Sequence, residues 1–415
     1  MISSKFQKYI QQISTLADRY CGADYSRKIN AFRAERERIL SNVWQKKLVP
    51  EEIGEPGKDR VFRDIDFDTI VHFAKKYAED PQYLRFLYEV SEISIRFGEL
   101  ERGDRLLRYL VSSRKVGKDT AFLAKVQQNL GNVAFYRNEY GSAVKYYQKS
   151  LGLYSDLGDL KGIACLKNAI GATHVEQGKL GDGEKLFKEA RDIATMENYG
   201  EYLSKTNMNL GNIYHMNGKF DDSIQCYQKA LEVVQENGGQ ADAIAPIYNN
   251  IALAYKSKGE YGKALEYLDK SLSLSKETND LYTKAFSYLF QSEIYCYQKD
   301  HSRSMALVTS AFSIFSEIGD RLSMAEAYKI LGMVNRDSKR YDIAESYFEN
   351  SIRINERYNN LLNLAEAQIE LSRLYQVTGD KSKTKKYLQQ PLKIYQKMEA
   401  HNRAESVAKD LEKLQ

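Results

Sequence analysis

The side chains with the most distinctive spacing in this 415-residue chain are asparagines. Asn129 and Asn132 are three residues apart, and so are Asn209 and Asn212. Asn250 occupies the position that matches Asn129 and Asn209. An amide offers a hydrogen-bond donor and an acceptor together, which matches the unpaired N–H and C=O groups of an extended peptide. The pattern therefore favours binding of a peptide backbone. The full set comprises Asn129, Asn132, Asn168, Asn209, Asn212, Asn249 and Asn250.

Catalytic or metal chemistry has no comparable support. The histidines are isolated, without an HExxH motif or a Cys/His cluster, and the four cysteines lack CxxC spacing. The segment Gly181-Asp182-Gly183 lacks the P-loop lysine. An enzyme would need a site hidden near the N-terminus, where the acidic residues are explained more simply as helix surfaces and caps. We expect no catalytic residues, no metal and no cofactor.

Composition restricts the class of protein further. The chain is 43% hydrophobic and 28% charged with five prolines, so it should be folded nearly throughout. Its net charge of +5 is a weak excess, and nucleic acid is an unlikely partner. No segment has the length and apolar character of a membrane span or the pattern of a signal peptide, so we expect a cytoplasmic protein without membrane contact.

A short motif recurs every forty or forty-one residues, with one unit skipped before its last occurrence. Eight residues beyond its first member stands a glycine, an asparagine or a lysine, where we expect one helix to end. The motif occurs at Leu130-Gly131-Asn132, Ile170-Gly171-Ala172, Leu210-Gly211-Asn212, Ile251-Ala252-Leu253 and Leu331-Gly332-Met333, and the turn residues are Asn138, Gly178, Gly218, Gly259, Lys339 and Gly379.

A second helix follows each turn and ends at a second set of turn residues. In this helix a small residue precedes a large apolar one, as in Ala143 with Tyr147 and Ala344 with Phe348. Each unit is therefore a pair of amphipathic helices that cannot bury its apolar face alone, so the units must stack. The second turns are Gly158-Asp159, Asn198-Tyr199, Gly238-Gly239, Asn279-Asp280, Gly319-Asp320 and Asn359-Asn360.

This pattern of leucine, glycine, tyrosine, turn glycine, small residue and aromatic resembles the tetratricopeptide-repeat (TPR) family over residues 82–398. The forty-residue period is similar to that of kinesin light chain, the Partner-of-Inscuteable group and bacterial peptide-sensing regulators. The resemblance implies an all-α, right-handed superhelical solenoid of about eight helix pairs. It also implies that the inner face of the first helix of each pair, helix A, lines a groove for a peptide.

Candidate groove residues besides the asparagines follow from that resemblance. They are mostly aromatic and cationic, the residue types that usually anchor interfaces. An alternative stays open, in which some asparagines serve neighbouring helix backbones and Phe135 or Phe286 packs between units. The additional candidates are Phe135, Tyr136, Lys205, His215, Met216, Lys256, Phe286, Tyr297, Arg336 and Arg373.

The sequence as a whole predicts four segments. Residues 1–48 form an N-terminal helical hairpin, 49–65 a linker, 66–398 the repeat array and 399–415 a C-terminal capping helix. Within the array the fifth unit is irregular, since Gln291 takes the leucine position and Lys299 the turn position.

Two functions are consistent with these predictions. The first is a non-catalytic adaptor that binds an extended peptide segment of a partner protein in the concave groove. The alternative is a peptide-sensing regulator whose N-terminal helices bind a protein or DNA target. The exposed apolar ends of a solenoid add the hypothesis of a homodimer.

Overall fold

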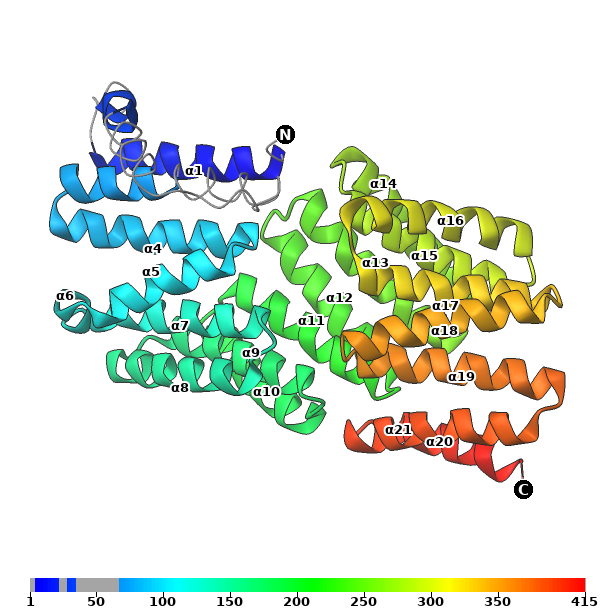
Figure 1. Ribbon diagram of the computed structural model, residues 1–415. Helices are drawn as coiled ribbons and strands as arrows, with labels where there is room; N and C mark the ends of the chain where they lie inside the picture. The colour runs from blue at the N-terminus through cyan, green and yellow to red at the C-terminus, as the bar shows by residue number, and fades with distance from the viewer. Residues whose placement is uncertain (1–3, 22–27, 35–66, 415) are drawn as a thin grey trace. The chain divides into compact units, whose positions relative to one another are not determined.

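The computed structural model describes residues 4–21, 28–34 and 67–414 (Figure 1). These residues are helical, apart from short turns, and include no strand, which confirms the all-α prediction. The predicted linker 49–65 and most of the second hairpin helix lie outside the described residues. Residues 28–34 are helical, and a further helix covers residues 67–77.

Helix pairs follow one another along the chain from α4 onward. Eight consecutive pairs are described, which confirms the predicted number. The first helix of each pair is helix A and the second is helix B, except that the short helix α6 intervenes after the first pair. The helices are α1 Ser4–Cys21, α4 Asp80–Phe97, α5 Leu100–Ser112, α6 Arg114–Gly117, α7 Thr120–Tyr136, α8 Tyr140–Leu157, α9 Leu160–Glu176, α10 Leu180–Met196, α11 Gly200–Met216, α12 Phe220–Glu236, α13 Ala241–Lys258, α14 Tyr261–Glu277, α15 Leu281–Tyr297, α16 His301–Ile318, α17 Arg321–Asp337, α18 Tyr341–Arg357, α19 Leu361–Thr378, α20 Lys381–Lys397 and α21 His401–Glu412.

Both predicted sets of turn residues adopt the left-handed conformation. The turns within pairs have φ between 60° and 85°, and the turns between pairs have φ between 52° and 77°. Asparagine and glycine tolerate this region, so they are the residues found at most of these positions. Lys299 has φ 66°, so the irregular fifth unit keeps the same turn.

In four of the pairs a helix A glycine contacts a helix B aromatic ring. A Cβ atom at Gly332 would lie 2.6 Å from the ring of Phe348, and one at Gly131 or Gly211 would overlap Tyr147 or Tyr227. Only glycine lets these rings approach the neighbouring backbone so closely. The recurring glycine of the sequence motif is therefore a packing requirement.

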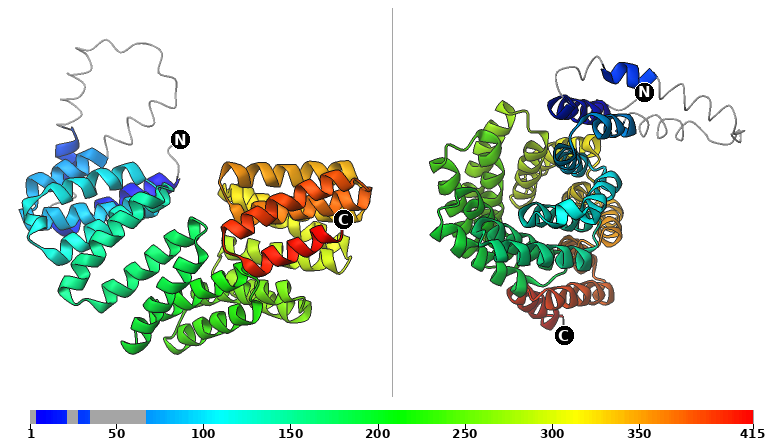
Figure 2. Two further views of the ribbon diagram at one scale, coloured as in Figure 1. Left: turned by 90° about the horizontal axis from the view of Figure 1, so that it is seen from below. Right: turned by 90° about the vertical axis from the view of Figure 1, so that its left-hand side faces the viewer.

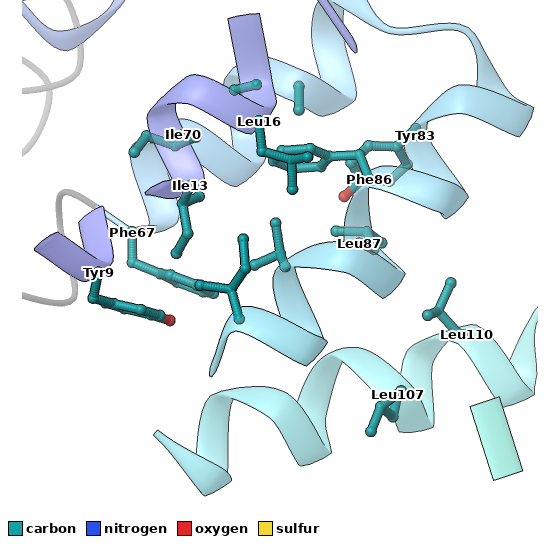
Figure 3. Close-up of a cluster of buried hydrophobic side chains, with 14 of the residues drawn as sticks. Tyr9, Ile13, Leu16, Phe67, Ile70, Tyr83, Phe86, Leu87, Leu107 and Leu110 are labelled. Carbon is teal, nitrogen blue, oxygen red and sulfur yellow. The ribbon is translucent and has the colours of Figure 1, made fainter. Parts of the chain in front are cut away.

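The described chain divides into two compact units, residues 1–162 and 163–415. In the first unit, Tyr9, Ile13 and Leu16 of α1 share a buried cluster with Phe86 and Leu87 of α4. Figure 3 shows Tyr9 beside Phe67, and Leu16 on the side of the cluster where Phe86 lies. The Tyr9 hydroxyl lies 2.9 Å from Ser94 Oγ. The N-terminal helix is thus part of a core that it shares with the first repeat.

The second unit closes upon itself. Leu388 of α20 and Val407 of α21 share a buried cluster with Phe187 of α10 and Leu210 of α11. The backbone N–H of Gly181 also donates to Glu399 Oε2 at 3.1 Å. Figure 2 shows the red C-terminal helices beside the green repeats of this unit. Helix α21 therefore covers α20 and also joins the two ends of the unit.

The glycine contacts generate a stability prediction. We expect Gly131→Ala to lower the free energy of unfolding by about 1–3 kcal/mol, because the new methyl group overlaps the Tyr147 ring. Gly152→Ala on α8 is the matched control, since a Cβ there meets no atom within 4 Å. Helix propensity should make this control neutral or stabilising by up to about 1 kcal/mol. Thermal melting followed by circular dichroism measures both, and an equal effect would rule out the packing explanation.

Candidate functional site

A stripe of charged side chains crosses the inner helices of the second unit. Its members are Lys256 on α13, Glu293 on α15, Lys329 on α17, Glu366 on α19 and Arg403 on α21. Successive members are 36 or 37 residues apart, three or four fewer than the repeat period. The stripe therefore shifts by about one helical turn at each repeat while the sign of the charge alternates. We call these five residues the charge ladder.

Three of the four neighbouring pairs in the charge ladder are ion pairs. Lys256 pairs with Glu293. Lys329 Nζ lies 2.9 Å from Glu366 Oε2, and Arg403 Nη1 lies 3.0 Å from Glu366 Oε1. Lys329 also binds Glu326 at 2.8 Å, and its side chain is only 4% exposed. Each buried charge thus has at least one opposite partner, as burial requires.

The pKa directions follow from this pairing. Burial alone would raise the pKa of Glu293, but Lys256 and Lys329 outweigh burial and hold that pKa below its ordinary value. Burial would lower the pKa of Lys329, but Glu326 and Glu366 raise it well above the ordinary value. Glu293 and Lys329 therefore stay ionised near neutral pH.

A second group of charges lies one turn further along the same helices. Glu370 binds Arg336 Nη1 at 2.6 Å and also pairs with Arg373. Tyr297 donates from its hydroxyl to Glu293 Oε1 at 3.2 Å, which links this group to the ladder. Arg373 and Tyr297 are partly exposed, whereas Glu370 is buried.

These two groups line a cavity of about 400 Å³ in the second unit. Its charged walls are the ladder residues with Glu370, Arg373 and Lys258, and its aromatic walls include Tyr261 and Tyr297. The buried part of the wall is paired, so the groups most accessible to a ligand are the Arg373 guanidinium and the Tyr297 ring. This combination suits a carboxylate next to an apolar or aromatic group.

His215 contacts two residues that line the cavity, Arg403 and Ser257. Arg403 Nη2 donates to the His215 carbonyl at 3.2 Å, and His215 Nε2 lies 2.9 Å from Ser257 Oγ. Burial, with the nearby Arg403 cation, lowers the pKa of His215 to about 3. The imidazole is therefore neutral wherever the unit is folded near neutral pH.

The predicted asparagines are largely bonded to one another or to neighbouring helices. Asn209 Nδ2 donates to Asn168 Oδ1 at 2.9 Å, and Asn132 Nδ2 donates to Asn129 Oδ1 at 3.1 Å. Asn212 accepts from the Tyr227 hydroxyl at 2.6 Å. Asn132 accepts from Tyr147 in the same way, at 2.8 Å.

Asn249 is buried, and its amide serves the next repeat. Its Nδ2 donates to the Thr283 carbonyl at 3.0 Å, and its Oδ1 accepts from Ser287 Oγ at 2.9 Å. Asn250 is partly buried beside it. These bonds match the alternative in which an amide serves the neighbouring helix, and they leave the Asn249 amide engaged within the fold.

The other predicted residues separate into two groups. Lys256, Tyr297 and Arg373 line the cavity, and Arg336 reaches it through Glu370. The remaining candidates lie elsewhere or make local contacts: Phe286 packs on Phe315, Phe135 on Tyr140, Lys205 pairs with Glu201 at 2.7 Å, Met216 joins the cluster around Leu210, and Tyr136 is 60% exposed.

Sequence reasoning missed four of the five ladder residues and Glu370 of the second group of charges. These residues are Glu293, Lys329, Glu366, Glu370 and Arg403. The available signal was the alternation of Lys and Glu at 36 or 37 residues, which a search at the forty-residue period does not detect.

Among the described residues, Cys296, His301 and Asp337 bring potential metal ligands within 4.8 Å of one another. Asp337 is already paired with Lys299 at 2.6 Å and with Arg336 at 3.0 Å. Burial and the nearby Asp337 raise the pKa of the Cys296 thiol to about 12. A protonated thiol and a neutralised carboxylate make this trio a poor cation site.

Family models described as tetratricopeptide repeat match residues 124–160, 162–236, 202–277 and 323–397, together more than half of the chain. The chain belongs to the tetratricopeptide-repeat family. This confirms the resemblance that the sequence motif indicated.

Individual relatives are more distant. Transcriptional activator NprA from Geobacillus stearothermophilus is 29% identical over 154 residues, 37% of each chain. Protein KINESIN LIGHT CHAIN-RELATED 2 from Arabidopsis thaliana is 23% identical over 185 residues, 42% of this chain and 28% of the relative. The chain thus spans roughly a third of the length of these relatives.

A solved structure of the Rap conjugation gene regulator of plasmid pLS20, in complex with a peptide, has a similar fold. Its TM-score is 0.59 at 17% identity, covering 91% of this chain and 97% of that one. In the described part of the chain, no helix is long and apolar enough to cross a bilayer.

The charge ladder predicts that replacing a buried lysine destabilises the fold more than replacing an exposed one. We expect Lys329→Met to lower the free energy of unfolding by about 3–5 kcal/mol, because Glu326 and Glu366 lose their shared partner. Lys276→Met on the exposed side of α14 is the matched control and should change it by less than about 0.5 kcal/mol. Urea unfolding measures both, and a small effect at Lys329 would show that the ladder does not support the fold.

His215 predicts a pH dependence of stability. Its folded pKa of about 3 lies below its unfolded value, so its contribution is present above about pH 6.5 and is lost as the pH falls toward 3. Between pH 7.5 and 5 the loss should be about 2 kcal/mol. We expect His215→Gln to remove this part of the pH dependence, and the exposed His401→Gln to retain it. Identical urea midpoints against pH for all three proteins would contradict this assignment.

Proposed function

We propose that this chain is a non-catalytic, cytoplasmic protein-interaction module that binds a peptide segment of a partner in the cavity of its second unit. The observation that carries this proposal is the cavity of about 400 Å³, which is lined by side chains of both helices A and helices B, with Arg373 and Tyr297 accessible at its wall. A volume of this size admits a few side chains of an extended peptide rather than a folded domain.

The electrostatics favour a particular kind of segment. The cations that line the cavity are Lys256, Lys258, Lys329, Arg373 and Arg403, and the lining carboxylates are Glu293, Glu366 and Glu370. Lys258 and Lys329 have further partners in Asp221 and Glu326. Lys329 and Glu293 are buried and neutralise their partners. A ligand carboxylate would therefore bind best at Arg373, whose guanidinium can make two parallel hydrogen bonds.

The relatives support a peptide-binding role. The solved regulator from plasmid pLS20 has the same fold and was obtained with a bound peptide. Peptide recognition through helix A faces would use this fold without any catalytic group, since affinity comes from the contacts themselves.

A second candidate function is a regulator that changes state on binding a peptide. It is favoured by the match to a transcriptional activator and by the division of this chain into two units with separate cores. In this case the second unit would sense the peptide and the first would bind the target. Compaction on peptide binding, measured by small-angle scattering, distinguishes this regulator from a static adaptor.

The test is selection of ligands from a random peptide library displayed on phage, with the full chain as bait. We expect the selected peptides to bind with micromolar affinity, as peptide grooves commonly do, and to lose about tenfold or more in affinity to the double variant Arg373→Ala with Tyr297→Ala. Fluorescence polarisation of the labelled peptides measures the difference.

The matched control is Arg357→Ala with Tyr358→Ala, which removes the same two residue types from an exposed site at the end of α18. This control should bind the peptides as the unmodified chain does. Selection of no peptide above background, or equal binding by both double variants, would reject the cavity as the binding site.

A further inference from the structure

A separate trough of about 1030 Å³ lies within the first unit. Its base is one face of α4, and its sides are α1 and the beginning of α7. Helix α4 contributes Arg85, Glu89, Glu92 and Arg96, which are spaced three or four residues apart and so share one face of the helix. This is the helix A face of the first repeat.

The carboxylates of the trough are already engaged by neighbouring donors. Glu89 accepts from the Tyr20 hydroxyl at 2.5 Å and pairs with Arg19 at 3.3 Å. Glu92 accepts from the Tyr88 hydroxyl at 2.9 Å. The third acid, Asp119, accepts from the Phe122 N–H at 2.9 Å as the cap of α7.

The cations of the trough are not matched in the same way. Lys8, Arg85, Arg96 and Lys125 are exposed, and none of them forms an ion pair with a carboxylate in the described part of the chain. They come from all three helices, one from α1, two from α4 and one from α7. The trough therefore presents an excess of positive charge on every side.

An apolar strip lies between these cations. Leu16 and Ile93 are buried in the floor, and the rings of Tyr88 and Phe122 meet edge to face with centroids 5.4 Å apart. A site with an apolar floor and a charged rim can bind both the side chains and the charges of an extended segment.

From this arrangement we infer that the trough is a second binding site, for an extended acidic segment of a partner protein. Carboxylates of the segment pair with Arg85, Arg96 and the two lysines, while an aromatic or aliphatic side chain rests on Phe122 and Tyr88.

This site differs from the cavity of the second unit in the balance of its charges. The buried charges of the cavity are paired with one another, whereas Lys8, Arg85, Arg96 and Lys125 of the trough form no ion pair with a carboxylate within the described chain. Its occupancy therefore needs no rearrangement of existing ion pairs. The inference does not depend on the function proposed for the second unit.

The experiment uses the full chain and a short fluorescein-labelled peptide of alternating Glu and Ser around one Tyr. An otherwise identical peptide with Gln in place of Glu tests the requirement for charge. We expect the acidic peptide to bind, the Gln peptide to bind about tenfold or more weakly, and the affinity to fall as salt rises. Fluorescence polarisation gives both dissociation constants.

Two variants with equal changes of charge locate the binding. Arg85→Glu with Lys125→Glu should weaken binding of the acidic peptide by about tenfold or more. Lys145→Glu with Lys149→Glu, exposed on α8 outside the trough, should change it by less than about twofold. Circular dichroism confirms that both variants are folded, which exposed positions should permit.

The remaining outcomes are decisive. Equal weakening by both variants would mean attraction to net charge alone and would overturn the inference, as would the absence of binding. Stronger binding of duplex DNA than of the acidic peptide, sensitive to Arg85 and Lys125, would assign the trough to nucleic acid instead. Unchanged binding by the Arg373 and Tyr297 variant would separate this site from the cavity of the second unit.

Discussion

A charge removed from water must meet an opposite charge, and the interior of the second unit is arranged around this requirement. Lys329 is nearly inaccessible and lies between Glu326 and Glu366. The helices A on either side, α15 and α19, each contribute a residue of opposite charge to the ladder, Glu293 and Glu366. A change of charge at the ladder position of one repeat would therefore affect the neighbouring repeats. The helix pairs are similar in backbone, but the ladder makes their order along the chain specific.

The ladder also explains how the unit ends. Glu366 has two cationic partners, and the second of them, Arg403, lies on α21 beyond the last helix pair. The same guanidinium reaches the carbonyl of His215 on α11. A helix that would otherwise only shield the last repeat therefore links the first and last parts of the unit, with the apolar cluster of Tyr395, Met398 and Val407 beneath it.

The fold was predictable from the sequence because its signals are local. A left-handed turn favours glycine or asparagine, which occupy most of the turn positions. A close ring contact requires glycine, so Gly211 and Gly332 recur at the repeat period. The charge ladder has no such local signal. Its period depends on how far each helix A is rotated relative to the previous one, and its last member, Arg403, lies outside the repeats.

The asparagines were conspicuous in sequence, but the side chains of Asn212 and Asn249 form hydrogen bonds within the fold. The division into two units at residue 162 likewise falls inside a regular helix, α9, where composition and pattern do not change.

The closure of the second unit and the occupancy of its cavity are linked through a single carboxylate. A ligand cation that binds Glu366 must displace Lys329 or Arg403, and the loss of Arg403 would also remove its bond to the His215 carbonyl. A ligand anion at Arg373 leaves no buried carboxylate without a partner, because Glu370 keeps its ion pair with Arg336 when Arg373 binds the ligand. Anionic ligands can therefore bind without breaking the contacts of Arg403, and cationic ligands cannot. Since a ligand shifts a conformational equilibrium only through its different affinity for the two states, the sign of the ligand's charge decides whether binding preserves or opens the unit.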